Sequence, residues 1–277
     1  MIQGEKRMQQ KKTLQELTFK NNFMFGAVLL DPENCKGVIE RSIGTEIERV
    51  EVSKEKSIVY NPEFKGIRLD AYAKDGKNTR YNVEMQILPQ PALQKRARYY
   101  HSQIDMEVLL AGVAYAELPD TYVIFICDFD PFGEGKYRYT KRCICKEVPK
   151  LEMNDGAHTI FLSTQGTNED EVSEELVTFL KFVGAEPSES EKDFKDPFVK
   201  RLQDAVREVK ASREMGARYM TFQELLKDER EAGRTEGQAE KLRNQVKKKL
   251  AKGDSIEKIA DDLVEDISVI EDIVKEI

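Results

Sequence analysis

Residues 68–86 read RLDAYAKDGKNTRYNVEMQ, two runs of alternating apolar and polar side chains around a polar turn. Alternation with a period of two is typical of β-strands, and Gly and Asn between the runs favour a tight connection. We therefore expect an antiparallel hairpin. Its apolar side chains share one face, and Asp70, Glu84 and Gln86 share the other.

The apolar pattern also predicts the register of this hairpin. When Asp70 lies opposite Glu84, every apolar residue faces an apolar residue, and the loop has three residues, Gly76–Asn78, or five, 75–79. A two-residue Asp-Gly turn would place Asp70 beside Tyr81 and mix the two faces. Since a slip of one residue turns a whole strand over, the pattern favours the first register.

The polar face of the hairpin has the chemistry of a cation site. In the favoured register the Cβ atoms of Asp70 and Glu84 lie about 5 Å apart. Two carboxylates this close repel unless one is protonated or a cation lies between them, and a hard ion such as Mg²⁺ prefers carboxylate oxygens. Gln86 can hold a water or a phosphate oxygen but is no base. The alternative is an ordinary hairpin with a solvated polar face.

Composition limits the class of protein. The chain has 277 residues, of which 40% are hydrophobic and 34% charged, enough for one large domain or a medium domain with an appendage. No apolar run approaches the roughly 18 residues of a spanning helix, and no secretory signal follows the charged start, so we expect a cytoplasmic protein with no membrane partner. The four cysteines lack paired zinc-site spacing and are expected to be reduced and structural.

The net charge of −7 does not exclude a nucleic-acid partner, because of where the charge lies. Residues 251–277 contain nine acidic and three basic residues, whereas residues 1–250 contain 42 acidic and 41 basic residues. The main part of the chain is therefore close to neutral and can carry a local basic surface.

The order of expected elements indicates an α/β body followed by helices. The patterns predict helices over 13–44 with a break at Asp31-Pro32, strands near 47–60, the hairpin, a helix over 92–116, a buried strand over 121–129, further strands, and helices from 169 onward. We expect three parts: an α/β domain over 1–186, a charged helical extension over 187–250, and an acidic pair of short helices over 251–277.

Six segments in combination resemble a known family. They are RLDAYA (68–73), NVEMQ (82–86), KRARYYHSQ (95–103), GVAYAELPDTYVIFICDFDPF (112–132), EREAGRTEGQAEK (229–241) and LAKGDSIEKIADDL (250–263). The arrangement D…E-x-Q on a hairpin before a helix resembles the PD-(D/E)XK nuclease core. More narrowly, the chain resembles the recombination-promoting nuclease and transposase family, in which the motif lysine is commonly glutamine. The resemblance implies a restriction-endonuclease-like mixed β-sheet core flanked by helices.

The resemblance also implies roles for individual residues. Asp70 and Glu84 would bind Mg²⁺ (or Mn²⁺), with the Met85 carbonyl as a further ligand. Gln86 stands where the wider superfamily has a lysine that orients or activates water. Glu40 would be an auxiliary carboxylate, and its alternative is a solvated helix charge.

Glutamine cannot replace the charge of a lysine, because only a cation lowers the pKa of a water and stabilises charge on a phosphate. Lys95, Arg96 and Arg98 on the following helix are candidates for that positive charge and for DNA contacts, or else surface residues. His101 and His158 are isolated, and we interpret both as structural.

Two functions remain open from the sequence. The first is a metal-dependent DNA endonuclease that hydrolyses phosphodiester bonds and is tied to recombination or mobile elements. The second is a catalytically weak or inactive nuclease fold that acts as a DNA-binding or assembly module, which the glutamine favours. The helix over 213–250 would form a homodimer or remain a solvated charged helix. The acidic ending is expected to dock on a protein surface such as Lys247–Lys249, because its net charge of −6 repels DNA.

Overall fold

The computed structural model describes residues 12–53, 57–58 and 67–276. The chain divides into two compact units, the body Met1–Gly216 and the C-terminal unit Ala217–Ile277. Within the described residues, every helix is too short or too polar to span a bilayer.

The body is built on a mixed sheet of six strands in the order β1-β4-β5-β6-β8-β7. The central strands β5, β6 and β8 are parallel, β4 and β7 pair antiparallel with β5 and β8, and β1 pairs antiparallel with β4. The strands are β1 (Val50–Ser53), β4 (Ala71–Asp75), β5 (Arg80–Gln86), β6 (Thr121–Cys127), β7 (Arg138–Lys141) and β8 (Ala157–Ser163), and a separate pair consists of β2 (Ser57–Ile58) and β3 (Ile67–Arg68).

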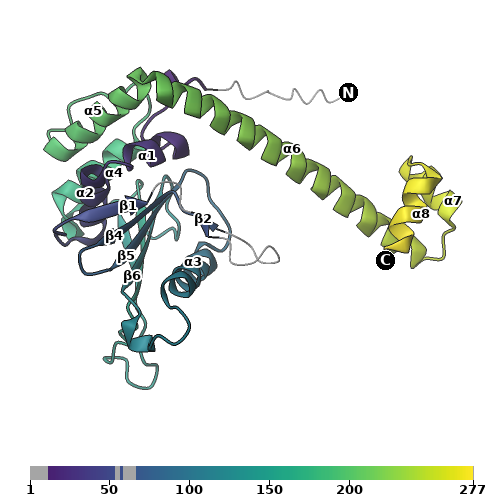
Figure 1. The fold of residues 1–277 in the computed structure, drawn as a ribbon, viewed down its shortest axis with the longest axis horizontal. Helices are drawn as coiled ribbons and strands as arrows, with labels where there is room; N and C mark the ends of the chain where they lie inside the picture. Colours follow the sequence, from purple (N-terminus) through teal and green to yellow (C-terminus); the bar gives the residue numbers. More distant parts are fainter. Residues whose placement is uncertain (1–11, 54–56, 59–66, 277) are drawn as a thin grey trace. The chain divides into compact units, whose positions relative to one another are not determined.

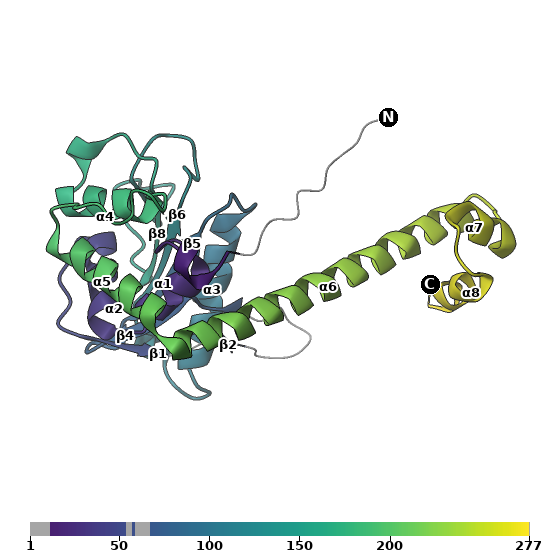
Figure 2. The same cartoon turned by 90° about the horizontal axis from the view of Figure 1, so that it is seen from above.

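Helices lie on both faces of the sheet, as Figures 1 and 2 show. One face carries α1 (Asn22–Val28), α2 (Pro32–Ile43), α4 (Glu174–Gly184) and α5 (Pro197–Ala211), and the other carries α3 (Leu93–Val108). Short 3₁₀ turns lie at Leu14–Glu16, Tyr115–Glu117 and Glu169–Glu171. The predicted restriction-endonuclease-like α/β class, with helices after it, is confirmed.

The hairpin has the register predicted from its apolar pattern. Ala71 pairs with Val83 and Ala73 pairs with Tyr81, which continues to Asp70 opposite Glu84. The turn closes with a bond from the Asn78 amide to the Asp75 carbonyl, at 3.1 Å, and Asn78 has a φ of 68°. Asparagine tolerates this left-handed conformation better than most residues. The turn therefore matches the register that has a three- or five-residue loop, and it excludes a two-residue Asp-Gly connection.

Helix α3 lies over the hairpin and β6 because its apolar stripe is buried there. Leu93, Ala97, Tyr100 and Ile104 pack with Val123, Phe125 and Cys127 of β6 in one cluster. The helix predicted over 92–116 is shorter in the structure, because α3 ends at Val108. Gly112, with a φ of 87°, has a left-handed conformation that cannot continue the helix.

The division of the chain differs from the boundaries drawn from the sequence. Helix α5 contacts α1, α2 and α4, so the body extends past residue 186. The polar stretch before α5 resembles a linker in composition, yet α5 has an apolar stripe, Val199, Leu202 and Val206, that is buried in the body.

The C-terminal unit has its own small core. It contains most of α6 (Arg213–Leu250), α7 (Ile256–Leu263) and α8 (Ile267–Lys275). Val246 of α6 is buried against Ile259, Ala260 and Ile270. Lys249 pairs with Asp262, and Arg243 pairs with Glu276. The acidic ending thus packs on the basic end of α6 in the same chain, as expected.

Candidate active site

The predicted site residues meet where strand β4 begins beside β5, under α3. Asp70 directly precedes β4, and Glu84 and Gln86 lie near the end of β5. Residues 84 and 86 point to the same face by strand periodicity, and both contact α3. The sheet edge, the hairpin and one helix therefore position the group.

The two carboxylates are joined through the backbone of the opposite strand. The Asp70 amide donates to Glu84 Oε1 at 3.3 Å, and the Met85 amide donates to Asp70 Oδ2 at 3.1 Å. The Asp70 side chain thus continues the hydrogen bonding of β5 just before the first residue of β4. This arrangement holds Asp70, Glu84 and Met85 together.

Glu84 is a charged group in an enclosed position, with 0% of its surface exposed. Arg96 Nη2 donates to its Oε2 at 2.8 Å, and the Tyr100 hydroxyl donates to the same oxygen at 3.3 Å. Burial, followed by repulsion from Asp70, raises the pKa of Glu84 to about 8, and Arg96 opposes this rise. A buried carboxylate whose pKa is raised beside a second carboxylate is a frequent feature of functional sites.

Arg96 connects the whole group. Its Nη1 donates to Gln86 Oε1 at 3.2 Å, and its Nε donates to the Tyr100 hydroxyl at 2.6 Å. The guanidinium also lies 5.0 Å from the centre of the Tyr100 ring. The Gln86 amide nitrogen in turn donates to the Met85 carbonyl at 3.0 Å. A single cation thus contacts both Glu84 and Gln86 of β5.

The other candidate basic residues lie elsewhere on α3. Lys95 and Arg98 are exposed, whereas Arg96 is half-buried. Lys95 and Arg98 are one and two positions from Arg96, and residues at these spacings do not share a helix face, so only Arg96 enters the site. Lys95 and Arg98 are left on the outer surface of the helix.

Glu40 and the two histidines have local roles in the structure. Among the described residues, Glu40 bonds the Ile47 amide at 2.7 Å and pairs with Lys36, and it makes no contact with Asp70 or Glu84. His101 is buried, and its ring nitrogens bond the hydroxyls of two threonines on β6 and β8. His158 stacks on a tyrosine ring with centroids 4.4 Å apart.

Two residues of the site were not singled out from the sequence. Tyr100 lies in the core, and its hydroxyl also bonds Glu84. Asn82 is fully buried two positions before Glu84 on the same face, and its amide makes no hydrogen bond of ordinary geometry to the described residues. The period-two pattern Asn82, Glu84, Gln86 was the signal for Asn82.

The residues present fit a divalent cation. In the described part of the chain, no three or more His, Cys, Asp or Glu side chains gather as a metal-binding group. Asp70, Glu84 and the Met85 carbonyl nevertheless supply hard oxygens within one small group. Mg²⁺ commonly uses one or two carboxylates and keeps several waters, so this small set is sufficient.

Comparison with known proteins gives one result that covers most of the chain. The family model described as PD-(D/E)XK nuclease family transposase matches residues 37–236, which include the hairpin, α3 and all six strands of the mixed sheet. Neither the curated proteins nor the solved structures include a match. The chain belongs to the PD-(D/E)XK nuclease family transposases.

Proposed function

We propose that the protein is a metal-dependent DNA endonuclease that hydrolyses phosphodiester bonds. Family membership supports a nuclease- or transposase-like function. The observation that carries the finer proposal is the pair Asp70 and Glu84, linked by the Asp70 and Met85 amides, with Glu84 fully buried. A buried carboxylate beside a second carboxylate is costly without a cation.

The site residues divide the work of hydrolysis. Asp70, Glu84 and the Met85 carbonyl would hold Mg²⁺ or Mn²⁺. When bound, such an ion polarises a phosphoryl oxygen and lowers the pKa of a water. Gln86 orients a water by hydrogen bonding, because a neutral amide cannot remove its proton.

Arg96 supplies the positive charge that Gln86 lacks. It reaches both Glu84 and Gln86, so it lies within one side-chain length of any phosphate bound at this site. A guanidinium suits phosphate recognition because it is always charged and donates two parallel hydrogen bonds. In the structure it neutralises Glu84, and it is placed to turn from that carboxylate to a phosphate oxygen.

The second candidate is a nuclease fold that binds DNA or assembles without cutting. One observation favours it: Arg96 forms an ion pair with Glu84, one of the two carboxylates a metal would need. A guanidinium that stays on Glu84 would exclude a divalent cation and leave a stable but inactive site.

Plasmid cleavage with Mg²⁺ or Mn²⁺ tests the proposal. The parent chain should nick or linearise supercoiled DNA, and Asp70→Ala and Glu84→Ala should each reduce cleavage at least 100-fold, while Gln86→Ala reduces it less. Glu51→Gln, at an exposed acid paired with Lys74, is the matched control and should cut like the parent. Cleavage by Asp70→Ala at the parent rate would contradict the proposal, and calorimetry without metal binding in the parent would favour the second candidate.

A further inference from the structure

Helix α6 carries positive charge along one face. Four residues, Arg230, Arg234, Lys241 and Lys248, are separated by four, seven and seven positions and all lie within α6. At about 100° per residue, these spacings return to within roughly 40° of one direction on the helix. We call this set the basic stripe.

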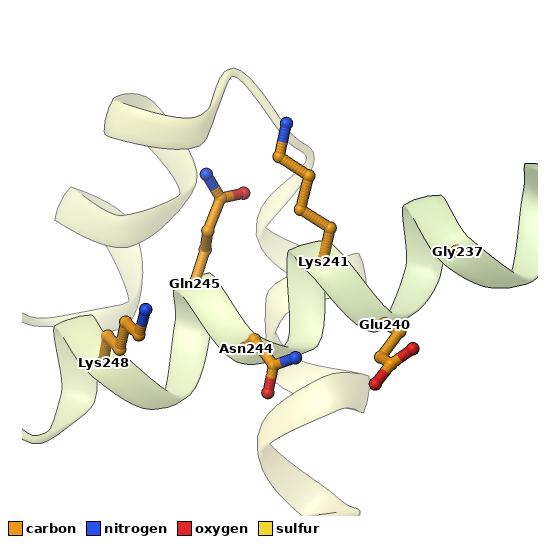
Figure 3. A pocket seen from close by; sticks show the side chains of 6 residues that line it. All are labelled: Gly237, Glu240, Lys241, Asn244, Gln245 and Lys248. Carbon is orange, nitrogen blue, oxygen red and sulfur yellow. The ribbon is translucent and has the colours of Figure 1, made fainter. Parts of the chain in front are cut away.

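Acidic side chains of the same helix lie away from the basic stripe. Asp228, Glu231, Glu236 and Glu240 are all about 80° or more from the direction of Lys241. Figure 3 shows the stripe near one end of α6, where Lys241, Gln245 and Lys248 rise from one side of the helix and Glu240 points to the other. Figure 3 draws a shallow pocket on this part of the helix, and all the residues that line it come from α6. Charge is therefore segregated around the helix rather than mixed.

The cations of the basic stripe are unpaired and exposed. Among the described side chains, none of Arg230, Arg234, Lys241 and Lys248 forms an ion pair, and all four are exposed. Two neighbouring basic residues off the stripe are paired instead: Arg243 with Glu276 and Lys249 with Asp262. Arg230 and Arg234 are four positions apart, a spacing at which like charges repel and a bound anion is favourable.

The core of the C-terminal unit leaves this face open. Val246, which is fully buried, and its neighbours Leu242 and Leu250 pack against α7 and α8. These three positions point about 100–180° from Lys241, so α7 and α8 cover the side of α6 away from the stripe. The acidic ending thus neutralises one side of α6 and leaves the other positive.

We propose that the basic stripe binds the sugar–phosphate backbone of duplex DNA without reading its sequence. The stripe extends over about 27 Å of helix, and duplex DNA carries one negative charge per about 1.7 Å of its axis. Lysine and arginine bind phosphates regardless of base, and the amide of Gln245, on the same side of the helix, adds donors for phosphate oxygens. The choice of DNA as the polyanion rests on the proposed function.

Binding of the full-length protein to a 30-base-pair duplex, measured by fluorescence anisotropy in EDTA at several salt concentrations, tests this inference. Lys241→Gln/Lys248→Gln should weaken binding about tenfold at low salt and flatten the slope of log affinity against log salt by about 2, since each lost phosphate contact removes about 0.9. Glutamine preserves helix propensity. The control Lys247→Gln/Lys258→Gln makes the same charge change at exposed positions off the stripe and should alter affinity less than twofold.

Equal losses in the two double variants, or a parent chain that binds no duplex, would overturn the inference. A stripe variant that keeps its DNA affinity but changes its sedimentation coefficient would also overturn it, in favour of contact between protein chains. The cleavage test is separate, because EDTA removes the metal. If Asp70→Ala cuts like the parent while the stripe variant loses affinity, the proposed catalytic site fails and the stripe stands.

Discussion

At the scale of single residues, Arg96 decides the electrostatics of the site. Glu84 is a buried carboxylate beside Asp70 and needs positive charge. The sequence has Gln86 at the position where a lysine would supply that charge. Arg96 comes from the next helix and contacts both Glu84 and Gln86. The positive charge of the site therefore comes from helix α3 and not from strand β5.

Replacing Arg96 should affect both stability and cleavage. Arg96→Ala removes hydrogen bonds to Glu84, Gln86 and Tyr100, and we expect a loss of about 1–3 kcal/mol in the free energy of unfolding and at least a 100-fold loss of cleavage. Arg96→Lys keeps the charge without the fork and should recover part of the activity but less of the stability. Urea unfolding and plasmid cleavage measure the two effects.

Lys95→Ala is the matched control for Arg96, because Lys95 is exposed on the same helix. It should leave the free energy of unfolding unchanged. If Arg96→Ala cut DNA as fast as Lys95→Ala, the guanidinium would have no part in the reaction and its ion pair with Glu84 would be purely structural.

His101 should make the body sensitive to acid. Burial lowers the pKa of His101 to about 4, below its ordinary value of 6.5. The unfolded chain then binds more protons than the folded chain below pH 6.5, so the free energy of unfolding should fall as pH drops from 6.5 to 4, by at most about 1.4 kcal/mol per pH unit. Unfolding of the parent and of His101→Gln between pH 4 and 7 measures this share, and curves of equal slope would contradict the prediction.

At the scale of elements, the turn of the hairpin is held by one side chain. Asp75 Oδ1 accepts the amides of Lys77 and Thr79, each at 2.9 Å, and its Oδ2 accepts the Tyr81 hydroxyl at 2.9 Å. These bonds fix the longer loop and hence the register that places Asp70 opposite Glu84. The position of Asp70 opposite Glu84 therefore depends on a turn several residues away from both.

Asp75→Ala should consequently lower the free energy of unfolding by about 2–3 kcal/mol, because it removes three hydrogen bonds to one carboxylate. Asp75→Asn keeps an acceptor for the two amides and should lose less. Lys77→Ala, at an exposed position of the same turn, is the control for urea unfolding. A loss in Asp75→Ala no larger than in Lys77→Ala would show that the apolar faces alone set the register.

At the scale of the whole molecule, the two units should behave separately. The contacts of Glu84, Gln86 and Arg96 are all made within the body, and the core around Val246 is made within the C-terminal unit. Loss of one core should therefore leave the other intact.

Deleting residues 251–277 tests this separation. The deletion removes a net charge of −6, so DNA affinity should stay the same or rise, and cleavage should persist. It also uncovers Leu242, Val246 and Leu250, and a second truncation with these three changed to serine controls for aggregation. Anisotropy measures the affinity, and a tenfold loss in a truncation whose body remains folded would contradict the prediction.

The sequence by itself determined the features that depend on neighbours along the chain. Alternating side chains in 68–86 determined the hairpin, its register and the face shared by Asp70 and Glu84, because a period of two leaves only one apolar pairing. The uninterrupted apolar run in 121–129 similarly indicated a central strand, and β6 is one. The negative charge of residues 251–277 indicated that this segment would pack on basic residues, and Asp262 does form an ion pair with Lys249.

Only the tertiary structure decided which distant residues meet. The sequence does not distinguish three basic candidates on α3, which are Lys95, Arg96 and Arg98. The packing of the helix on β6 brings Arg96 alone to Glu84. The same packing buries Glu84 and raises its pKa, and it gives Tyr100 both a core role and a polar one. Periodicity specifies which face of an element is buried, but the partner across the interface depends on the angle and position at which the two elements pack, and no local pattern contains that information.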